Sequence, residues 1–148
     1  MTHCQYCKGP VRIVDAEKVY GKNRVPKGNK VALCEPCQAW VSCHKSGIPM
    51  GTVAKANLRS MRKLLHDRFD PLWREKLFRG KHYLDRRKAA YMWLAEQMNI
   101  SPDQTHFGKF NEEQTREALA HVNQYVQSRG CSFKITPNGI RLMKGEAP

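Results

Sequence analysis

The chain carries Cys4-Gln5-Tyr6-Cys7-Lys8-Gly9 near its start and Cys34-Glu35-Pro36-Cys37 after a gap, so 26 residues separate two Cys-x-x-Cys pairs. Each pair places two thiolates on one tight turn, and a hairpin between the pairs lets the two turns face each other. Four sulfurs can then surround one zinc ion tetrahedrally. We therefore predict a structural Zn²⁺ held by four ligands, namely Cys4, Cys7, Cys34 and Cys37.

The remaining cysteines and two histidines leave alternatives to this ligand set. Disulfides or free thiols would need another explanation for the spacing, and no apolar signal peptide precedes the cysteines, so we expect a reducing, cytoplasmic location. His3 or His44 could replace a cysteine, although four well-spaced thiols are already present. Cys43 and Cys131 are expected to be small buried apolar side chains. Gly9 is expected to supply the sharp backbone turn after the first pair.

The segments around the cysteines predict a small finger. Residues 11–14 and 30–33 are expected to form two short strands, joined by the turn-rich stretch 21–29. Residues 38–44 are expected to form a short helix that ends at Gly47 and Pro49. Knuckle, hairpin, knuckle and helix is the order of a treble-clef zinc finger, and a zinc ribbon is the alternative.

The chain after residue 50 is predicted to be mostly helical. Apolar residues recur every three or four positions from Thr52 to Phe69, and Asp70-Pro71 is expected to end this helix and start another over 72–79. A third helix is predicted over 85–98. A fourth begins at Asn111, with Gln114 at the capping-box position.

These elements predict an α+β fold with three parts. Residues 1–48 form the Cys4 zinc-finger module, 49–130 form a basic helical domain and 131–148 form a terminal β-hairpin and tail, in which residues 132–136 and 140–144 are the strands. Since no segment reaches the length of about 18 apolar residues that a membrane helix needs, we expect no membrane association.

Charge is distributed unevenly along the chain, whose net charge is +13. Residues 1–39 contain seven basic and three acidic residues, residues 40–95 contain thirteen and four, and residues 96–148 contain six of each. A polyanion binder would show such an excess, because cations that neutralise phosphates release condensed counterions. A solvated basic surface that only aids solubility is the alternative.

The candidate nucleic-acid contacts are the cations of the turn-rich stretch, of the first long helix and of the segment that follows residue 78. They are Lys22, Arg24, Lys27, Lys55, Arg59, Arg62, Lys63, Arg79, Lys81, Arg86 and Arg87. Their charged groups suit phosphates, and Tyr83 between them could stack on a base.

A treble-clef finger also raises the possibility of a metal-dependent nuclease. Such enzymes need one histidine on the hairpin and another on the following helix, but residues 8–33 contain no histidine. The weak catalytic candidates are His44, His66, Asp70 and His106. Each also has an ordinary structural explanation; Asp70, for example, could cap the helix that we expect to start at Pro71.

The chain resembles a phage- and prophage-encoded family of zinc-finger-containing domains over roughly residues 3–125. The stretches that carry the resemblance are Cys4–Gly9, Cys34–His44, Pro49–Ala54, His66–Trp73, Ala90–Ala95 and His106–Phe110. The resemblance implies zinc binding, a bacteriophage or prophage origin and a bacterial host cell. It implies no reaction, and it singles out His44, His66, Asp70 and His106 as motif positions.

Three functions remain open from the sequence. The first is non-enzymatic binding of nucleic acid, DNA or RNA, through the basic surface. The second is a protein-interaction module that targets a host enzyme or defence factor. The third is a treble-clef, metal-dependent nuclease.

Overall fold

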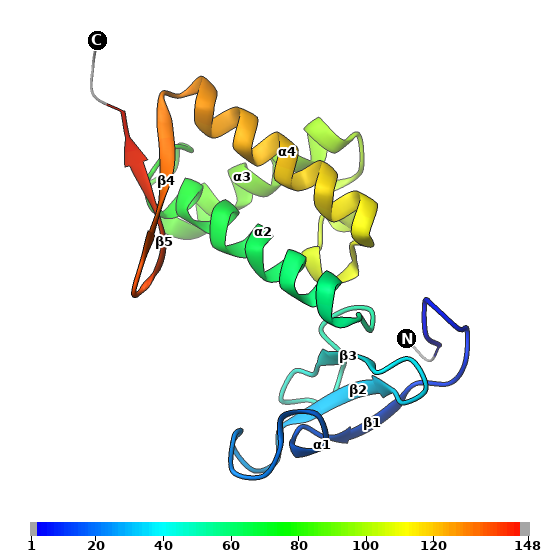
Figure 1. Cartoon of the computed structure of the whole chain (residues 1–148). Helices are drawn as coiled ribbons and strands as arrows, with labels where there is room; N and C mark the ends of the chain where they lie inside the picture. Colours follow the sequence, from blue (N-terminus) through cyan, green and yellow to red (C-terminus); the bar gives the residue numbers. More distant parts are fainter. Residues whose placement is uncertain (1–2, 146–148) are drawn as a thin grey trace. The chain divides into compact units, whose positions relative to one another are not determined.

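The computed structural model describes residues 3–145, which fall into two compact units (Figure 1). The first unit comprises Met1–Ser60 with Gly108–Phe110, and the second comprises Met61–Phe107 with Asn111–Pro148. The three-part division expected at residues 48 and 130 stays a prediction. Residues 146–148 of the expected tail lie outside the described residues.

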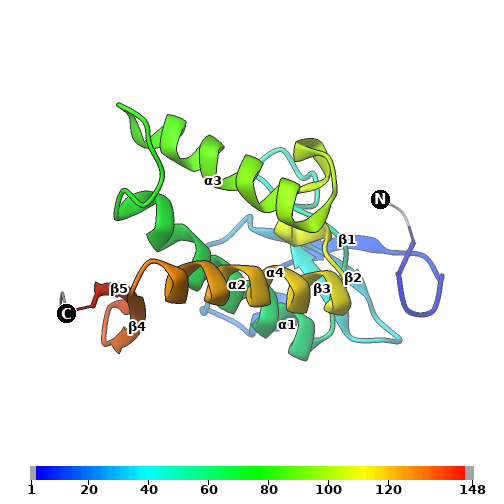
Figure 2. The same cartoon turned by 90° about the horizontal axis from the view of Figure 1, so that it is seen from above.

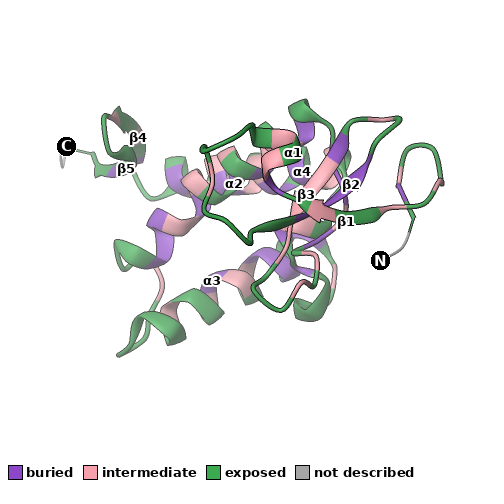
Figure 3. Cartoon of the chain, turned by 90° about the horizontal axis from the view of Figure 1, so that it is seen from below, coloured by how far each residue is buried: buried purple, intermediate pink, exposed green. Residues whose placement is uncertain are grey.

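The first unit contains an antiparallel sheet of three short strands in the order β1-β2-β3. These are β1 (Arg12–Asp15), β2 (Lys30–Cys34) and β3 (Ala39–Ser42), and the short helix α1 (Glu17–Tyr20) lies between β1 and β2 in the chain. Figure 3 shows β2 as the buried centre of the sheet, while β1 is largely exposed. The two strands predicted at 11–14 and 30–33 are confirmed within one residue.

The helix predicted over residues 38–44 is wrong, because this segment contains β3. Gln38 has a φ of 53°, so the chain reverses directly after the second cysteine pair. Trp40 then pairs with Leu33 of β2 on one side, and its backbone N–H and C=O both bond to Ala54 on the other. The second knuckle therefore lies in a β-hairpin, which is the arrangement of a zinc ribbon rather than of a treble clef.

A close approach of two backbones explains the segment that follows β3. A Cβ atom added to Gly51 would lie 2.0 Å from the carbonyl oxygen of Gly108, so only glycine fits there. The N–H of Thr52 donates to that same oxygen at 2.8 Å. Residues 108–110 thus belong to the first unit although they lie far along the chain.

The first long helix, α2 (Ala56–Arg74), continues through Pro71, so the predicted break at Asp70-Pro71 is wrong. A proline inside a helix costs about 3 kcal/mol. Phe69, Leu72 and Trp73 around it are all buried, and burial of one such side chain stabilises by about 1.5–3 kcal/mol. The free energy gained by burying these side chains therefore exceeds the cost of the proline. Asp70 is not an N-cap, and it accepts a hydrogen bond from the Trp73 indole at 3.2 Å.

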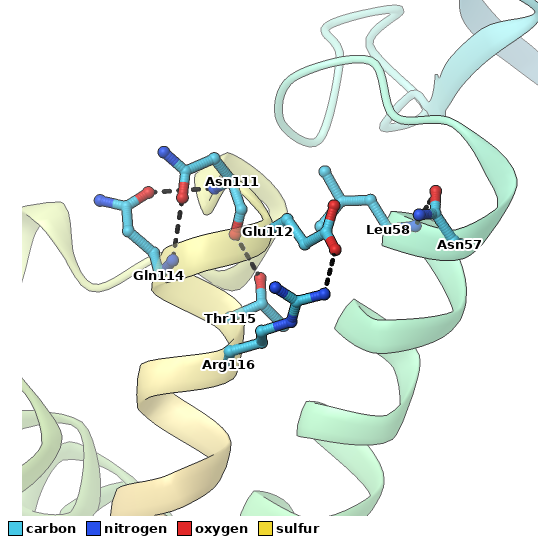
Figure 4. A network of polar contacts seen from close by, with 7 residues as sticks. All are labelled: Asn57, Leu58, Asn111, Glu112, Gln114, Thr115 and Arg116. Carbon is cyan, nitrogen blue, oxygen red and sulfur yellow. Dashed lines mark hydrogen bonds and ion pairs between the residues drawn. The ribbon is translucent and has the colours of Figure 1, made fainter.

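The other helices agree with the prediction. Helix α3 (Tyr83–Met98) and helix α4 (Glu112–Ser128) lie beside each other in the second unit, and the short 3₁₀ helices η1 (Pro102–Gln104) and η2 (Phe107–Lys109) lie between them in the chain (Figure 2). Helix α4 begins with the expected capping box. The Gln114 N–H donates to the Asn111 side chain at 2.9 Å, and the Asn111 N–H donates to the Gln114 side chain at 3.0 Å (Figure 4).

The chain ends in the predicted hairpin of β4 (Cys131–Thr136) and β5 (Gly139–Lys144). The core of the second unit is formed by the apolar stripes of the three long helices together with Phe107 of η2. Its buried members include Leu65, Phe69, Leu94, Phe107 and Val122. No helix among residues 3–145 combines the length and the apolar character needed to cross a membrane.

The cap of α4 gives a test of the fold. Asn111→Ala removes the acceptor for the Gln114 N–H, so it should lower the free energy of unfolding by about 1 kcal/mol. Urea denaturation followed by circular dichroism measures the change. Gln124→Ala, an exposed change within the same helix, is the control and should stay within about 0.5 kcal/mol of the unmodified protein. Equal stability of Asn111→Ala and the control would contradict the cap.

Candidate metal centre and basic surface

The four predicted ligands come together in the first unit. The sulfurs of Cys4, Cys7, Cys34 and Cys37 all lie within 4.8 Å of one another, and those of Cys7 and Cys34 are 3.6 Å apart. Zn–S bonds of about 2.3 Å in a tetrahedron place neighbouring sulfurs about 3.8 Å apart. The two turns therefore present their thiols at a separation that suits one zinc ion.

Both turns share a left-handed residue directly after the second cysteine. The residue after each pair, Lys8 or Gln38, has a left-handed φ, 63° and 53° respectively. In the first turn, the N–H of Tyr6 donates to the Cys4 sulfur at 3.4 Å and the N–H of Gly9 donates to the Cys7 sulfur at 3.3 Å. Such hydrogen bonds stabilise negative charge on the sulfurs.

The expected role of Gly9 needs correction. The sharp turn is made by Lys8, which has the positive φ, and not by the glycine. Gly9 instead lies close to a ligand, because a Cβ atom at this position would be 3.2 Å from the Cys7 sulfur. The glycine therefore leaves room for the N–H···S contact.

The thiols of this cluster differ in how readily they ionise. Burial opposes ionisation of Cys4, but backbone hydrogen bonds from Cys7 and Tyr6 bring the pKa of its thiol down to about 7. Burial and the neighbouring sulfurs raise the pKa of Cys37 to about 12. One thiolate thus forms readily, and further thiolates beside it need a positive charge. Four thiolates are ligands that zinc prefers.

The chemistry of this ligand set is structural. Cys4 and Cys34 are buried and pack with Ala32, Ala39 and Val53. Four protein ligands complete a tetrahedron, so no position is left for a water molecule to be activated. The metal-binding group found among residues 3–145 contains four cysteines and no histidine, so neither His3 nor His44 belongs to it.

The spare cysteines behave largely as expected. Cys131 is buried, with 8% of its surface exposed. Cys43 is half-buried, packs against the apolar residues around the metal ligands and has a pKa raised by burial. Neither sulfur is needed to complete the zinc coordination.

The four weak catalytic candidates do not form one group in a single unit. The Nδ1 atom of His66 lies 3.7 Å from a carboxylate oxygen of Asp70, and His66 and His106 line the same cavity in the second unit. His44 belongs to the first unit. Among the described residues, histidines and carboxylates make no group that could hold a catalytic metal. With β3 in place of the expected helix, the architectural reason for a nuclease is also lost.

The candidate cations differ in how they are used by the fold. The guanidinium of Arg59 lies over the Trp40 ring at 4.2 Å and donates to the Ala54 carbonyl. Arg62 is only 7% exposed, and Arg86 donates to the carbonyls of Trp73 and Gly80. The remaining candidates are exposed, and they are Lys22, Arg24, Lys27, Lys55, Lys63, Arg79, Lys81 and Arg87.

Three of the exposed candidates already have local partners. The guanidinium of Arg87 lies over the Tyr91 ring at 4.8 Å. Lys63 pairs with Asp67 at 3.0 Å, and the ammonium of Lys55 lies over the Tyr6 ring at 4.7 Å. Lys22, Arg24 and Lys27 form no ion pair with any described carboxylate. We call these three residues the loop cations.

Sequence reasoning missed a cavity of about 590 Å³ in the second unit. One wall is a face of α3 that includes Leu84, Lys88, Tyr91 and Met92 beside the predicted Arg87. Their spacing of three and four residues was a usable signal, because it places cations and apolar side chains on one helix face. The opposite wall, residues 102–107, has no regular pattern that would have revealed it.

Zinc content tests the metal centre. Cys34→Ser removes a buried ligand and should abolish the one zinc ion per chain, whereas Cys131→Ser should keep it. Elemental analysis of purified protein measures the stoichiometry. Structural zinc in small fingers has an apparent binding free energy of about 10–16 kcal/mol, so a chelator should also lower the melting temperature of Cys131→Ser. Equal zinc in both variants would contradict the ligand set.

Comparison with known proteins agrees with this centre. A family described as a zinc-finger-containing domain matches residues 1–125. No curated protein and no solved structure matches the chain. The matched part includes all four cysteines and the helices α2 and α3 in full, and it ends within α4. With four thiols placed to bind one metal ion, the chain belongs to this family of zinc-finger-containing domains.

Proposed function

We propose that this protein binds nucleic acid without catalysing a reaction, and that exposed cations of the zinc-finger unit contact the phosphates. The loop cations carry the proposal. They lie in the connection between α1 and β2, and no acidic residue occurs from residue 18 to residue 34. Exposed cations without carboxylate neighbours are available to neutralise phosphates, and the counterions condensed on the nucleic acid are then released.

The zinc centre supports this role by fixing the ends of the loop. Residue 30 starts β2, and β2 ends at the ligand Cys34. At the other end of the loop, Tyr20 packs edge-on against Trp40 of β3, with ring centroids 4.9 Å apart. The connection is thereby anchored at both ends to the sheet that the metal holds together.

The second unit carries cations that support the same function. Arg79 and Lys81 are exposed in the connection between α2 and α3. The nearby Asp85 accepts a hydrogen bond from the N–H of His82 at the start of α3. Its negative charge therefore stabilises the N-terminus of this helix. Because every nucleotide carries a phosphate, the exposed cations of each unit could contact a nucleic acid in the same way.

The salt dependence of binding tests the proposal. Binding of labelled duplexes and single strands is measured by fluorescence anisotropy over a series of salt concentrations. The logarithm of the binding constant falls linearly with the logarithm of the salt concentration. The triple variant K22Q/R24Q/K27Q should make this slope less steep by about 2.7 for duplex DNA, or by about 2.1 for a single strand. The reason is that three phosphate contacts would no longer release counterions.

The matched control is K134Q/R141Q/K144Q, which removes the same charge from three exposed residues of the terminal hairpin. It should leave the slope near that of the unmodified protein. Equal slopes for the two triple variants would show that the loop cations do not contact phosphates. Affinity that hardly changes with salt would rule out a phosphate-based function altogether. Cleavage of either strand would contradict the non-enzymatic part of the proposal.

A further inference from the structure

The 590 Å³ cavity in the second unit has the size and walls of a ligand site. Ligand cavities commonly have volumes of about 300–1,000 Å³. Helix α3 supplies one wall, residues 102–107 supply another and His66 of α2 completes the lining. All these residues belong to one unit, so the cavity does not depend on how the two units are placed.

The wall made by residues 102–107 is held firmly. The Ser101 N–H donates to the Gln104 side chain at 3.1 Å, and the Thr105 hydroxyl donates to the Ser101 carbonyl at 3.0 Å. Phe107 is 2% exposed and contacts the ring of Phe69, with centroids 5.1 Å apart. A preformed wall loses little conformational freedom when a ligand binds.

The charged residues of the cavity favour an anion. Arg87 and Lys88 line it, together with His66 and His106, and none of its ten lining residues is acidic. Arg87 is held with its guanidinium 4.8 Å from the centre of the Tyr91 ring. Neither Arg87 nor Lys88 forms an ion pair with a described carboxylate. Both can therefore offer N–H groups to phosphate oxygens.

The uncharged lining favours an aromatic ring beside that anion. The ring centroids of Tyr91 and His66 lie 5.3 Å and 4.7 Å from that of Phe107, so the three rings form one cluster. Burial raises the pKa of Tyr91 to about 12, so its hydroxyl stays protonated and can donate a hydrogen bond. Leu84 and Met92 at the cavity are 59% and 50% exposed, so a ligand in the cavity has apolar surface to cover.

We propose that this cavity binds one nucleotide, with its phosphate at Arg87 and Lys88 and its base against the aromatic and apolar lining. Inorganic phosphate would use the cations and leave the exposed Leu84 and Met92 uncovered. An uncharged aromatic compound would leave the cations without a partner. A nucleotide matches both the cations and the aromatic and apolar lining of the cavity, since it joins a phosphate to a ring that stacks on aromatic side chains.

This inference deepens the proposed function and rests on it for one point, which is that the nucleotide comes from a nucleic-acid strand. The same chemistry is present in a free mononucleotide. Binding to the cavity can therefore be tested separately from binding of a strand, and competition between the two distinguishes the sources.

The test uses the full chain and the four ribonucleoside 5′-monophosphates, each titrated separately by isothermal calorimetry. At least one should bind more tightly than its own nucleoside, ribose 5-phosphate or inorganic phosphate. R87Q/K88Q should weaken this binding by about tenfold or more, because hydrogen bonds between charged groups are lost. The control K134Q/R141Q removes the same charge from the terminal hairpin and should bind as the unmodified protein does.

A titration in which no monophosphate binds overturns the inference, and so does equal binding by R87Q/K88Q and the control. Displacement of the monophosphate by a short single strand assigns the site to strands, and lack of displacement assigns it to free nucleotides. Salt-dependent strand binding without monophosphate binding overturns this inference alone. Monophosphate binding without salt-dependent strand binding overturns the proposed function alone.

Discussion

The first unit depends on four sulfur atoms being held together by one metal ion. Its strands contain only four or five residues, and sheets this small are marginal unless other groups cover them. Cys34 ends the central strand, and Cys4 packs against Ala32 and Val53. The metal ligands are thus also core residues. Coordination joins the N-terminal turn to the sheet where few apolar contacts are available.

Features that depend on neighbours a few residues apart were predictable from the sequence. The spacing of the cysteines specified the ligand set, and the pair Asn111 and Gln114 specified the start of α4. The terminal hairpin followed from Pro137-Asn138-Gly139 between two β-prone segments. The cap and the hairpin turn are decided by contacts within a few residues, and each cysteine pair lies on one tight turn, so the local pattern carried the prediction.

The two errors in the fold came from distant partners. Residues 38–44 were expected to form a short helix that ends at Gly47 and Pro49, but Trp40 finds its backbone partners in Leu33 and Ala54. Pro71 would end an isolated helix, yet Phe69 and Leu72 are buried on either side of it. Local preference amounts to a few kcal/mol at most, and burial of several side chains exceeds it.

The basic residues show why a charge count is a poor guide to a binding surface. Arg59 and Arg86 look like Arg24 and Arg79 in the sequence, but their guanidinium groups are bonded to backbone carbonyls. A cation used in this way contributes to the net charge without offering its hydrogen bonds to a ligand. Only the three-dimensional neighbours of each side chain distinguish the two cases.

The cations that stay exposed occur in both units, and this limits the kind of ligand that can use them. A small anion can contact the loop cations or the cavity cations Arg87 and Lys88, but each group alone makes few contacts. A polymer that repeats the phosphate offers a partner to each group, and two linked contacts give a higher overall affinity than one contact where both can form. The proposed binding of nucleic acid would therefore use the cations of both units, whereas an isolated phosphate compound would use those of one.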